Sequence, residues 1–330
     1  MKIFVIFTGG TIGSSKIGEV ISPDRSCGYA LLDMYNQINN EVDFTTACPY
    51  TILSENLCGE NLNRLSDCID KCDIDSFDGI IVTHGTDTLQ FTSAFLGLVF
   101  ADFPKPIVVV SANYPLEDKR SNGFVNFSAA VEFIRSGCGS GAFVAYTNNG
   151  EYPKIHYASN LLAHPAYSDE VRSIHDEIYA VHSLSTRLYD NNSPAPDCVQ
   201  SFAYNLESGN STVYDLRKQL NLSQGKKLSS RSGILWLKSY VSMIYPRITS
   251  DIKAVLLEGY HSGTLNTQSK ELKDFCKQAE SLNIPVYLTG AEKGFYYESK
   301  LMFDELKIRV LPPVPPATAY VWLWLKLSNA

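Results

Sequence analysis

Residues 8–13 read Thr-Gly-Gly-Thr-Ile-Gly and follow directly on an apolar run at residues 3–7. A second stretch, residues 83–88 (Thr-His-Gly-Thr-Asp-Thr), follows another apolar run at residues 80–82. Open α/β sheets bind ligands at the carboxyl ends of their parallel strands. The two stretches are therefore predicted to form one site, although the first stretch alone is equally compatible with a simple tight turn.

Strand and helix patterns alternate through the first half of the chain. Short apolar runs predict strands, and apolar residues spaced three to four apart predict helices. The expected strands are 3–7, 79–83, 107–111 and 142–146, and the expected helices are 30–35, 62–72, 89–100 and 129–136. Such alternation implies right-handed crossovers and a mostly parallel sheet flanked by helices on both faces. The predicted fold class is α/β.

A chain of 330 residues is long enough for two domains. The alternation dissolves over residues 183–231, where turn-forming and polar residues dominate, and this range is predicted to be an inter-domain linker. Residues 1–182 would form the larger N-terminal domain with both threonine stretches. Residues 232–330, where strand and helix patterns resume, would form a smaller C-terminal α/β domain.

Composition narrows the class of protein. The formal net charge is −7, and no long block of Lys and Arg occurs, which argues against nucleic-acid and anionic-membrane partners. The N-terminus lacks a hydrophobic segment of signal-peptide length, and no apolar run approaches the roughly 20 residues that span a bilayer. We therefore expect a cytoplasmic protein.

Several cofactor and metal motifs are missing from the sequence. The cysteines form no C-x-x-C pair and the histidines no H-x-H or H-E-x-x-H spacing, so no metal site is expected. Neither G-x-G-x-x-G nor a P-loop is present, which argues against a dinucleotide or a nucleoside triphosphate. The absence of G-x-S-x-G lowers the case for a Ser-His-Asp hydrolase.

Two candidate sites also have a local structural explanation. Thr86 or Asp87 could cap the helix expected from residue 89, yet a helix start also offers free N–H groups to a carboxylate or an oxyanion. Ser54 and Glu55 end an extended run at residues 44–53 and could form a cap or a turn. These residues indicate a functional site only when they are considered together with the first threonine stretch.

In combination, the two threonine stretches resemble the bacterial-type L-asparaginase family, including the glutaminase-asparaginases. They match in order, spacing and strand-end context, and the likeness extends over most of the chain. Ser54 and Glu55 fall where the family carries a Ser-Gln or Ser-Glu pair. Ser111 and Ala112 match the Gly-Ala at the end of the third strand, and residues 261–265 fall at the site loop of the second domain.

The resemblance implies an amidohydrolase that converts L-asparagine, and in some members also glutamine, into the acid and ammonia without cofactor or metal. It implies three catalytic residues: Thr11 as the nucleophile, Thr86 as the residue that activates the attacking group or water, and Asp87, which binds the α-amino group of the substrate. It implies substrate-binding roles for Gly10, Ser54, Glu55, Gly85 and Ala112. In this reading Ala112 offers its carbonyl to the amide nitrogen, and backbone N–H groups near Gly10 and in the second stretch hold the oxyanion.

The sequence departs from the family pattern at two places. A lysine usually bonds to the second-loop threonine and aspartate, but the comparable position here holds Ala158 or Ser159, with Lys154 several residues away. The loop after the nucleophile usually carries a tyrosine, where this chain has Val20 or a neighbour. Tyr29 or Tyr35 could substitute if that loop folds differently.

These departures keep two alternatives open beside the enzyme. One is a non-catalytic or altered-specificity amino-acid-binding member of the fold, and the other is an amidotransferase subunit. The resemblance further implies a homodimer or homotetramer in which the second domain of one subunit completes the site of another. Three residues are candidates for such a contribution: Thr264, Glu292 and Glu298.

Overall fold

The structure is a computed structural model that describes residues 1–10, 12, 14–17, 20–23, 25–182, 202–204, 211–220, 222, 226–291 and 297–329. It divides into two compact units, Met1–Gly209 and Asn210–Ala330, called unit 1 and unit 2 below. Of the predicted linker, residues 183–201, 205–210, 221 and 223–225 lie outside the described residues. Within the remainder of that range the structure places β10 (Phe202–Tyr204) and α5 (Ser211–Arg217).

Unit 1 is built on one sheet with the strand order β10-β9-β8-β7-β6-β5-β1-β4. Strands β4, β1, β5, β6 and β7 pair in parallel, whereas β8, β9 and β10 continue the sheet antiparallel. The strands with bounds not yet given are β1 (Lys2–Phe7), β4 (Asp43–Ala47), β5 (Gly79–Thr83), β6 (Pro106–Val110), β7 (Gly141–Tyr146), β8 (Lys154–Tyr157) and β9 (Ile178–His182). The parallel arrangement brings the carboxyl ends of β1, β5, β6 and β7 to one edge.

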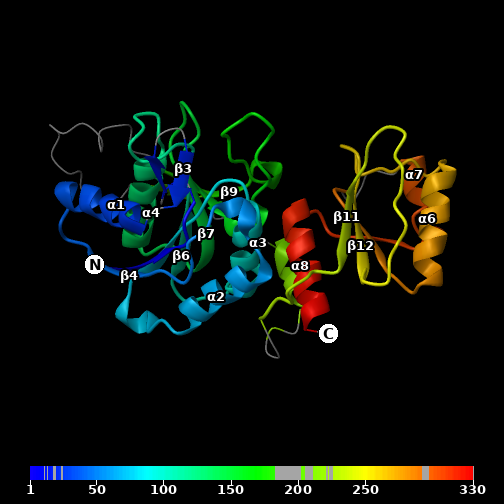
Figure 1. Ribbon diagram of the computed structural model, residues 1–330, viewed down its shortest axis with the longest axis horizontal. Helices are drawn as coiled ribbons and strands as arrows, with labels where there is room; N and C mark the ends of the chain where they lie inside the picture. Colours follow the sequence, from blue (N-terminus) through cyan, green and yellow to red (C-terminus); the bar gives the residue numbers. More distant parts are fainter. Residues whose placement is uncertain are drawn as a thin grey trace. The chain divides into compact units, whose positions relative to one another are not determined.

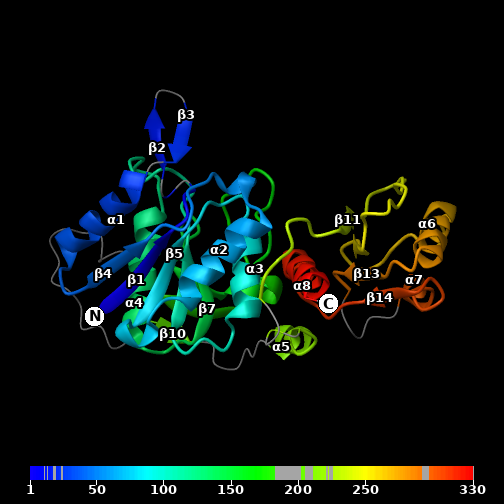
Figure 2. The same ribbon diagram turned by 60° about the horizontal axis from the view of Figure 1, so that its bottom comes forward.

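Helices cover both faces of this sheet (Figures 1 and 2). Helices α1 (Arg25–Ile38) and α4 (Gly123–Ser136) lie on one face, and α2 (Gly59–Asp70) and α3 (Leu89–Val99) lie on the other. Every residue of β5 and β6 is buried, because the strands are covered on both sides. The predicted α/β class with a mostly parallel, helix-flanked sheet is confirmed.

Short elements complete unit 1. A hairpin of β2 (Ser14–Ile17) and β3 (Val20–Pro23) follows the first threonine stretch. The 3-10 helices are η2 (Ser54–Asn56), η3 (Ile74–Ser76), η4 (Ala158–Asn160) and η5 (Ile174–Asp176). The extended run expected at 44–53 is a strand only as far as Ala47, since Pro49 has no N–H to donate to a ladder.

Unit 2 is a smaller parallel sheet in the order β11-β12-β13-β14, with bounds Ile234–Lys238, Ala254–Glu258, Val286–Thr289 and Ile308–Val310. Helix α6 (Lys270–Ser281) buries Leu272 and Phe275 in the core of this unit. Helix α8 (Pro316–Ser328) packs on β11, where the rings of Trp236 and Tyr320 stack with centroids 5.4 Å apart. The short helix α7 spans Glu298–Leu301.

Among the described residues, no helix combines the necessary length with sufficient apolar character to cross a bilayer.

Candidate active site

The two threonine stretches meet backbone to backbone at the carboxyl edge of the unit 1 sheet. Gly10 has a φ of +78°, and a Cβ on it would lie 2.2 Å from the backbone nitrogen of Gly85. A side chain at Gly10 would therefore force the two loops apart. Glycine at this position allows them to approach within contact distance, and so unites the two stretches in one place.

The first stretch is also tied to the segment that follows β4. Gly9 and Ile52 form a parallel bridge, the Gly10 N–H donates to the Ile52 carbonyl over 3.0 Å, and Ile52 N–H donates to Thr8 O over 3.2 Å. The Thr8 hydroxyl donates to the Thr83 carbonyl over 2.6 Å. Because the Gly10 N–H is engaged with Ile52, the role that the geometry supports for Gly10 is the close contact with Gly85.

Ser54 enters the same place from η2. Its side chain is buried, and a Cβ on Gly85 would lie 2.5 Å from Ser54 Oγ. Ser54 Oγ donates to Asp87 Oδ2 over 3.2 Å, and the Thr88 hydroxyl donates to the Ser54 carbonyl over 2.8 Å. Three of the predicted site residues, Ser54, Gly85 and Asp87, are thus brought together although 31 or more positions separate the first from the others.

Neither Thr86 nor Asp87 caps α3, so helix capping does not explain these two residues. The N-cap of α3 is Thr88, and no side-chain capping hydrogen bond is present there. The Thr88 hydroxyl is used on η2 instead. Thr86 is half-buried and the Asp87 side chain is exposed, so both are accessible at the start of α3.

His84 lies inside the second stretch but is structurally satisfied. Its ring is buried, Nδ1 lies 2.7 Å from the Gly85 carbonyl, and Nε2 lies 2.8 Å from the Thr92 hydroxyl. In the neutral tautomer that this geometry favours, Nδ1 donates to the carbonyl and Nε2 accepts from the hydroxyl. Burial lowers the pKa of His84 to about 4, because the charged form loses its hydration.

The end of β6 contributes the third strand end of the site. Ala112 is fully buried, and a Cβ on Gly123 would lie 2.8 Å from the Ala112 Cβ and 3.4 Å from Ile12 Cγ1. The Asn126 side chain donates to the Ser111 carbonyl over 2.8 Å. The backbone after β6 is therefore fixed from the N-terminal turn of α4.

Not every predicted site residue can be placed. Thr11 lies outside the described residues, although its neighbours Gly10 and Ile12 are described and buried. The Glu55 side chain is exposed on η2, next to buried Ser54. The roles predicted for the site residues stay predictions, and the structure supplies their arrangement.

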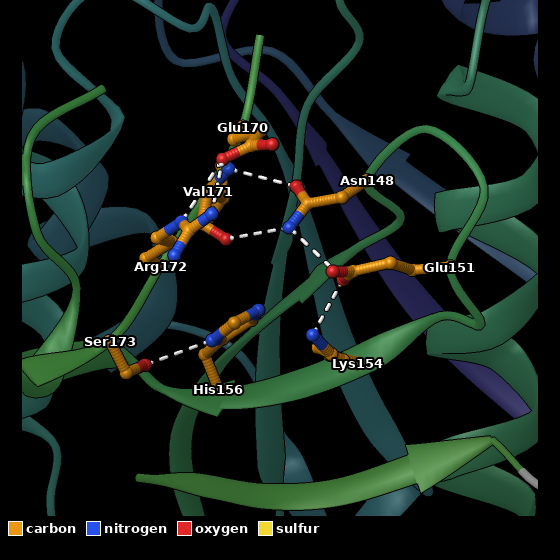
Figure 3. A network of polar contacts seen from close by, with 8 residues as sticks. All are labelled: Asn148, Glu151, Lys154, His156, Glu170, Val171, Arg172 and Ser173. Atoms are coloured by element: carbon orange, nitrogen blue, oxygen red, sulfur yellow. Dashed lines mark hydrogen bonds and ion pairs between the residues drawn. The ribbon is translucent and has the colours of Figure 1, made fainter. Parts of the chain in front are cut away.

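Lys154 is engaged away from the second stretch (Figure 3). It lies on β8 and forms an ion pair with Glu151 at 2.5 Å, and Glu151 also accepts from Asn148 over 3.2 Å. Ala158 and Ser159 are buried in η4, where a Cβ on Gly97 of α3 would lie 2.7 Å from the Ser159 nitrogen. These positions pack against the second half of α3 and supply no cation to Asp87.

The candidate tyrosines lie in different surroundings. Val20 is in β3 and pairs with Ile17. Tyr35 is buried, and its hydroxyl donates to Glu132 over 3.2 Å between α1 and α4. Tyr29 is 54% exposed, with its ring 5.9 Å from that of Phe7 at the carboxyl end of β1, so it is the tyrosine nearer to the site edge.

His164 belongs to none of the motifs in the sequence, and the structure brings it into electrostatic reach of Asp87. Burial lowers the pKa of His164, while the Glu170 backbone and the charges of Asp169 and Asp87 act in the opposite direction. No local motif marks this histidine, and its proximity to Asp87 arises only from the fold.

Unit 2 carries the loop that was matched to the second domain's site contribution. It follows β12, and Gly263, with a φ of +66°, packs so closely on Ala291 that a Cβ would lie 2.3 Å from its Cα. Thr264 is half-buried and Glu298 is exposed, whereas Glu292 lies outside the described residues. In the part of the chain that the structure describes, no group of three or more His, Cys, Asp or Glu could hold a metal ion.

Comparison with known families identifies the family to which the chain belongs. The family model described as "Asparaginase, N-terminal" matches residues 2–173, which is more than half of the chain and includes both threonine stretches. The chain belongs to the asparaginase family. The family that the sequence resembles is therefore confirmed.

Two named relatives of this asparaginase-family chain match shorter stretches of it. L-asparaginase 1 of Escherichia coli K12 is 30% identical over 133 residues, 39% of each chain. A glutaminase-asparaginase of Pseudomonas aeruginosa is 32% identical over 155 residues, 46% of this chain and 42% of that protein. The chain thus matches about two fifths of the length of these relatives.

The likeness in fold extends further than the likeness in sequence. The crystal structure of L-asparaginase I from Vibrio cholerae superposes with a TM-score of 0.72 at 19% identity, covering 99% of this chain and 93% of that one. At that identity the superposition shows the shared fold of the asparaginase family.

Proposed function

We propose that the chain is an amidohydrolase that hydrolyses the side-chain amide of L-asparagine to the acid and ammonia through a threonine nucleophile. The observation that carries the proposal is the meeting of the two threonine stretches through Gly10 and Gly85, with Ser54 hydrogen-bonded to Asp87. Membership of the asparaginase family and the L-asparaginase named among its relatives support it.

The residues divide between binding and chemistry. Ser54, Glu55 and Asp87 would hold the α-carboxylate and α-amino ends of the substrate, which orients the amide and favours amino acids over simple amides. The Thr11 hydroxyl would attack the amide carbon. Backbone N–H groups of the second stretch would stabilise the oxyanion, and loss of one such donor typically costs about 10²–10³ in rate.

The reaction would run in two halves. In the first, the hydroxyl proton of Thr11 is taken up through the Thr86–Asp87 pair, the C–N bond breaks, and the protonated nitrogen leaves as ammonia. In the second, water cleaves the resulting ester and regenerates the hydroxyl. The Ala112 carbonyl would receive a hydrogen bond from the amide nitrogen and so fix its position.

Ammonia release from L-asparagine and L-glutamine by the purified full chain tests the proposal. Thr11→Ala and Thr86→Val are each expected to lower kcat by about 10² or more, the range expected when one proton-transfer group is removed. Thr45→Val, on the exposed side of β4, is the matched control and should retain activity. Turnover that persists in both test variants would disprove the threonine mechanism.

The engagement of Lys154 with Glu151 favours one second candidate, a non-catalytic amino-acid-binding protein. Calorimetric binding of aspartate or asparagine without any ammonia release would favour this candidate. A homodimer or homotetramer, a cytoplasmic location and the domain boundaries at 182 and 231 also stay predictions. Sedimentation analysis of the full chain would test the first of these.

A further inference from the structure

Unit 2 contains a pocket of about 440 Å³ at the carboxyl ends of β11 and β12, named the unit 2 pocket below. Segment 239–245 lines it after β11, Tyr260 lines it after β12, and four residues of the range 266–271 line it at the start of α6. Small-molecule sites occupy about 300–1,000 Å³, and open α/β sheets bind ligands outside the carboxyl ends of their strands. The unit 2 pocket therefore has the size and the position of a ligand site.

The walls of the unit 2 pocket are held in place without a ligand. The Tyr260 hydroxyl donates to the Tyr240 carbonyl over 2.8 Å, and the Ile244 N–H donates to the Tyr240 hydroxyl over 3.0 Å. The Tyr245 ring packs on Phe275 in the core of unit 2, with centroids 4.9 Å apart. Because the walls are already ordered, a ligand loses little binding free energy to ordering them.

Three tyrosine rings supply most of the apolar lining, together with Met243 and Ile244. The hydroxyls of Tyr240 and Tyr260 are engaged with backbone groups, so these residues offer a ligand mainly their rings. Burial raises the pKa of Tyr245 to about 12, so its phenol is also neutral near neutral pH. Tyr240 and Ile244 are 50% and 78% exposed, which leaves apolar surface for a ligand to cover. Such rings attract cations as well as apolar groups.

Glu271 determines the sign of the charge that the unit 2 pocket accepts. Its own backbone N–H and the Ser269 hydroxyl, which donates to it over 2.8 Å, lower the pKa of this carboxyl, so it is ionised near neutral pH. None of the described residues that line the pocket is a Lys, Arg or His. In the described part of the chain no ion pair includes Glu271, and the adjacent Lys270 pairs with Asp274. An anion would meet this carboxylate, whereas a cation would complement it.

We propose that the unit 2 pocket binds an organic cation in which an ammonium group is joined to an apolar body about the size of an aromatic ring. The apolar body lies among the three tyrosine rings, and the ammonium group lies beside Glu271. The amide oxygens of Asn266 and Gln268, which line the same wall, accept its other hydrogen bonds. The site requires neither the threonine stretches nor turnover, so it is independent of the proposed amidohydrolase function.

Titration of the full chain with phenethylamine tests the site, when it is followed by NMR of labelled methionine methyl groups. Met243 lines the pocket, whereas the other three methionines do not. We expect a saturable shift of the Met243 methyl signal and no shift of the other three. The compounds 2-phenylethanol and 3-phenylpropionate keep the ring but replace the ammonium by a neutral or a negative group. Each is expected to bind about tenfold more weakly or worse.

Two pairs of variants separate the charge from the ring. Glu271→Gln keeps the shape of the side chain, and it should bind phenethylamine about tenfold more weakly with little change for 2-phenylethanol. Glu280→Gln is the matched control, because it removes the same charge at the other end of α6, where Glu280 pairs with Lys307. Tyr240→Leu and Tyr240→Phe both lose the hydroxyl, so their comparison isolates the ring. The leucine variant should bind about two- to fivefold more weakly than the phenylalanine variant.

Several results would overturn the proposal. One is the absence of a saturable Met243 shift with phenethylamine, and another is equal affinity for 3-phenylpropionate. Unchanged affinity for phenethylamine in Glu271→Gln would also overturn it. A Met243 shift that depends on protein concentration without any phenethylamine would show that a second copy of the chain covers the pocket, which likewise contradicts a small-molecule site.

Discussion

The loop after β5 and the loop between η4 and β9 each carry one imidazole, and the surroundings of the two rings differ. His84 is buried with both ring nitrogens partnered, by the Gly85 carbonyl and the Thr92 hydroxyl. His164 is less deeply buried, yet its Nε2 has no partner among the described residues. Although His84 lies inside the second threonine stretch, both of its ring nitrogens have partners, so the ring can only stabilise the loop. In His164, by contrast, Nε2 is left without a partner among the described residues.

This difference separates a histidine that can only stabilise its loop from one whose ring can still gain a proton. A neutral ring with two good hydrogen bonds in a dry site has no easy way to gain a proton, because the charged form is poorly solvated and would need a new acceptor. A ring with an unpartnered nitrogen, such as that of His164 among the described residues, still has a position at which a proton can bind. Proximity in sequence to a motif is thus a weaker guide than the partners of each ring nitrogen.

The largest expected effect is on the pH dependence of unit 1 stability. The pKa of His84 is about 4 in the folded chain against an ordinary value of 6.5, so the unfolded state binds the proton first as pH falls. Its contribution is fully present above pH 6.5 and is lost down to about pH 4, a change of about 3 kcal/mol. His84→Gln should remove that part of the pH dependence.

All three tryptophans lie in unit 2, so their fluorescence does not report unit 1. Hydrogen exchange of the β5 amides, corrected for intrinsic rates, measures the opening of unit 1 at neutral and acid pH. His164→Gln is the comparison and should alter the pH dependence less, because its ring is less deeply buried. An unchanged pH dependence in His84→Gln would contradict the structural role of His84.

Removing one hydrogen-bond partner of His84 should cost less free energy of unfolding than lowering the pH until its ring is protonated. Thr92→Val keeps the shape of the side chain but leaves Nε2 buried without a hydrogen bond, which is expected to cost about 2 kcal/mol of unfolding free energy. Ser93→Ala is the control, since that buried hydroxyl has no partner among the described residues and its loss should be neutral. Equal effects of the two changes, measured by urea unfolding, would speak against a satisfied His84.

The loop that carries His164 should open more easily when the hydrogen bonds between Asn148 and Val171 are weakened. Asn148→Asp replaces donors by a carboxylate beside Glu151 and the Val171 carbonyl, so we expect a loss of about 1–2 kcal/mol in the local opening free energy. Hydrogen exchange should become faster in residues 161–173 and stay unchanged in β5. Uniform acceleration across unit 1 would show that Asn148 supports the whole unit and not this loop.

The smallest effect is expected at Lys154. Its ion pair with Glu151 is partly exposed, with 28% and 42% of the two side chains accessible, so Lys154→Met should cost about 1 kcal/mol or less. Because Lys154 is turned toward Glu151, kcat for amide hydrolysis should stay within about twofold of the wild type. A hundredfold loss of kcat in this variant would show that Lys154 takes part in the proton relay.

Local pattern was sufficient for much of unit 1. The strands at 3–7 and 79–83 and the helix from residue 89 were predictable, because strands buried on both faces read as short continuous apolar runs. The order of strands and helices also predicted the parallel sheet. The alternative that Thr86 or Asp87 caps the helix is not realised, because the N-cap is Thr88, whose hydroxyl donates to the Ser54 carbonyl more than thirty residues away.

The sequence by itself determined the α/β class, the family and the two threonine stretches, because strand burial and glycine-rich strand ends are written in adjacent residues. Only the tertiary structure decided that Gly10 touches Gly85, that Lys154 is held by Glu151, and that the His164 ring lies beside Tyr146. Those contacts join residues distant in the chain or depend on the direction of a side chain in a hairpin. Neither composition nor spacing encodes the partner of a single nitrogen atom, and that partner separates His84 from His164.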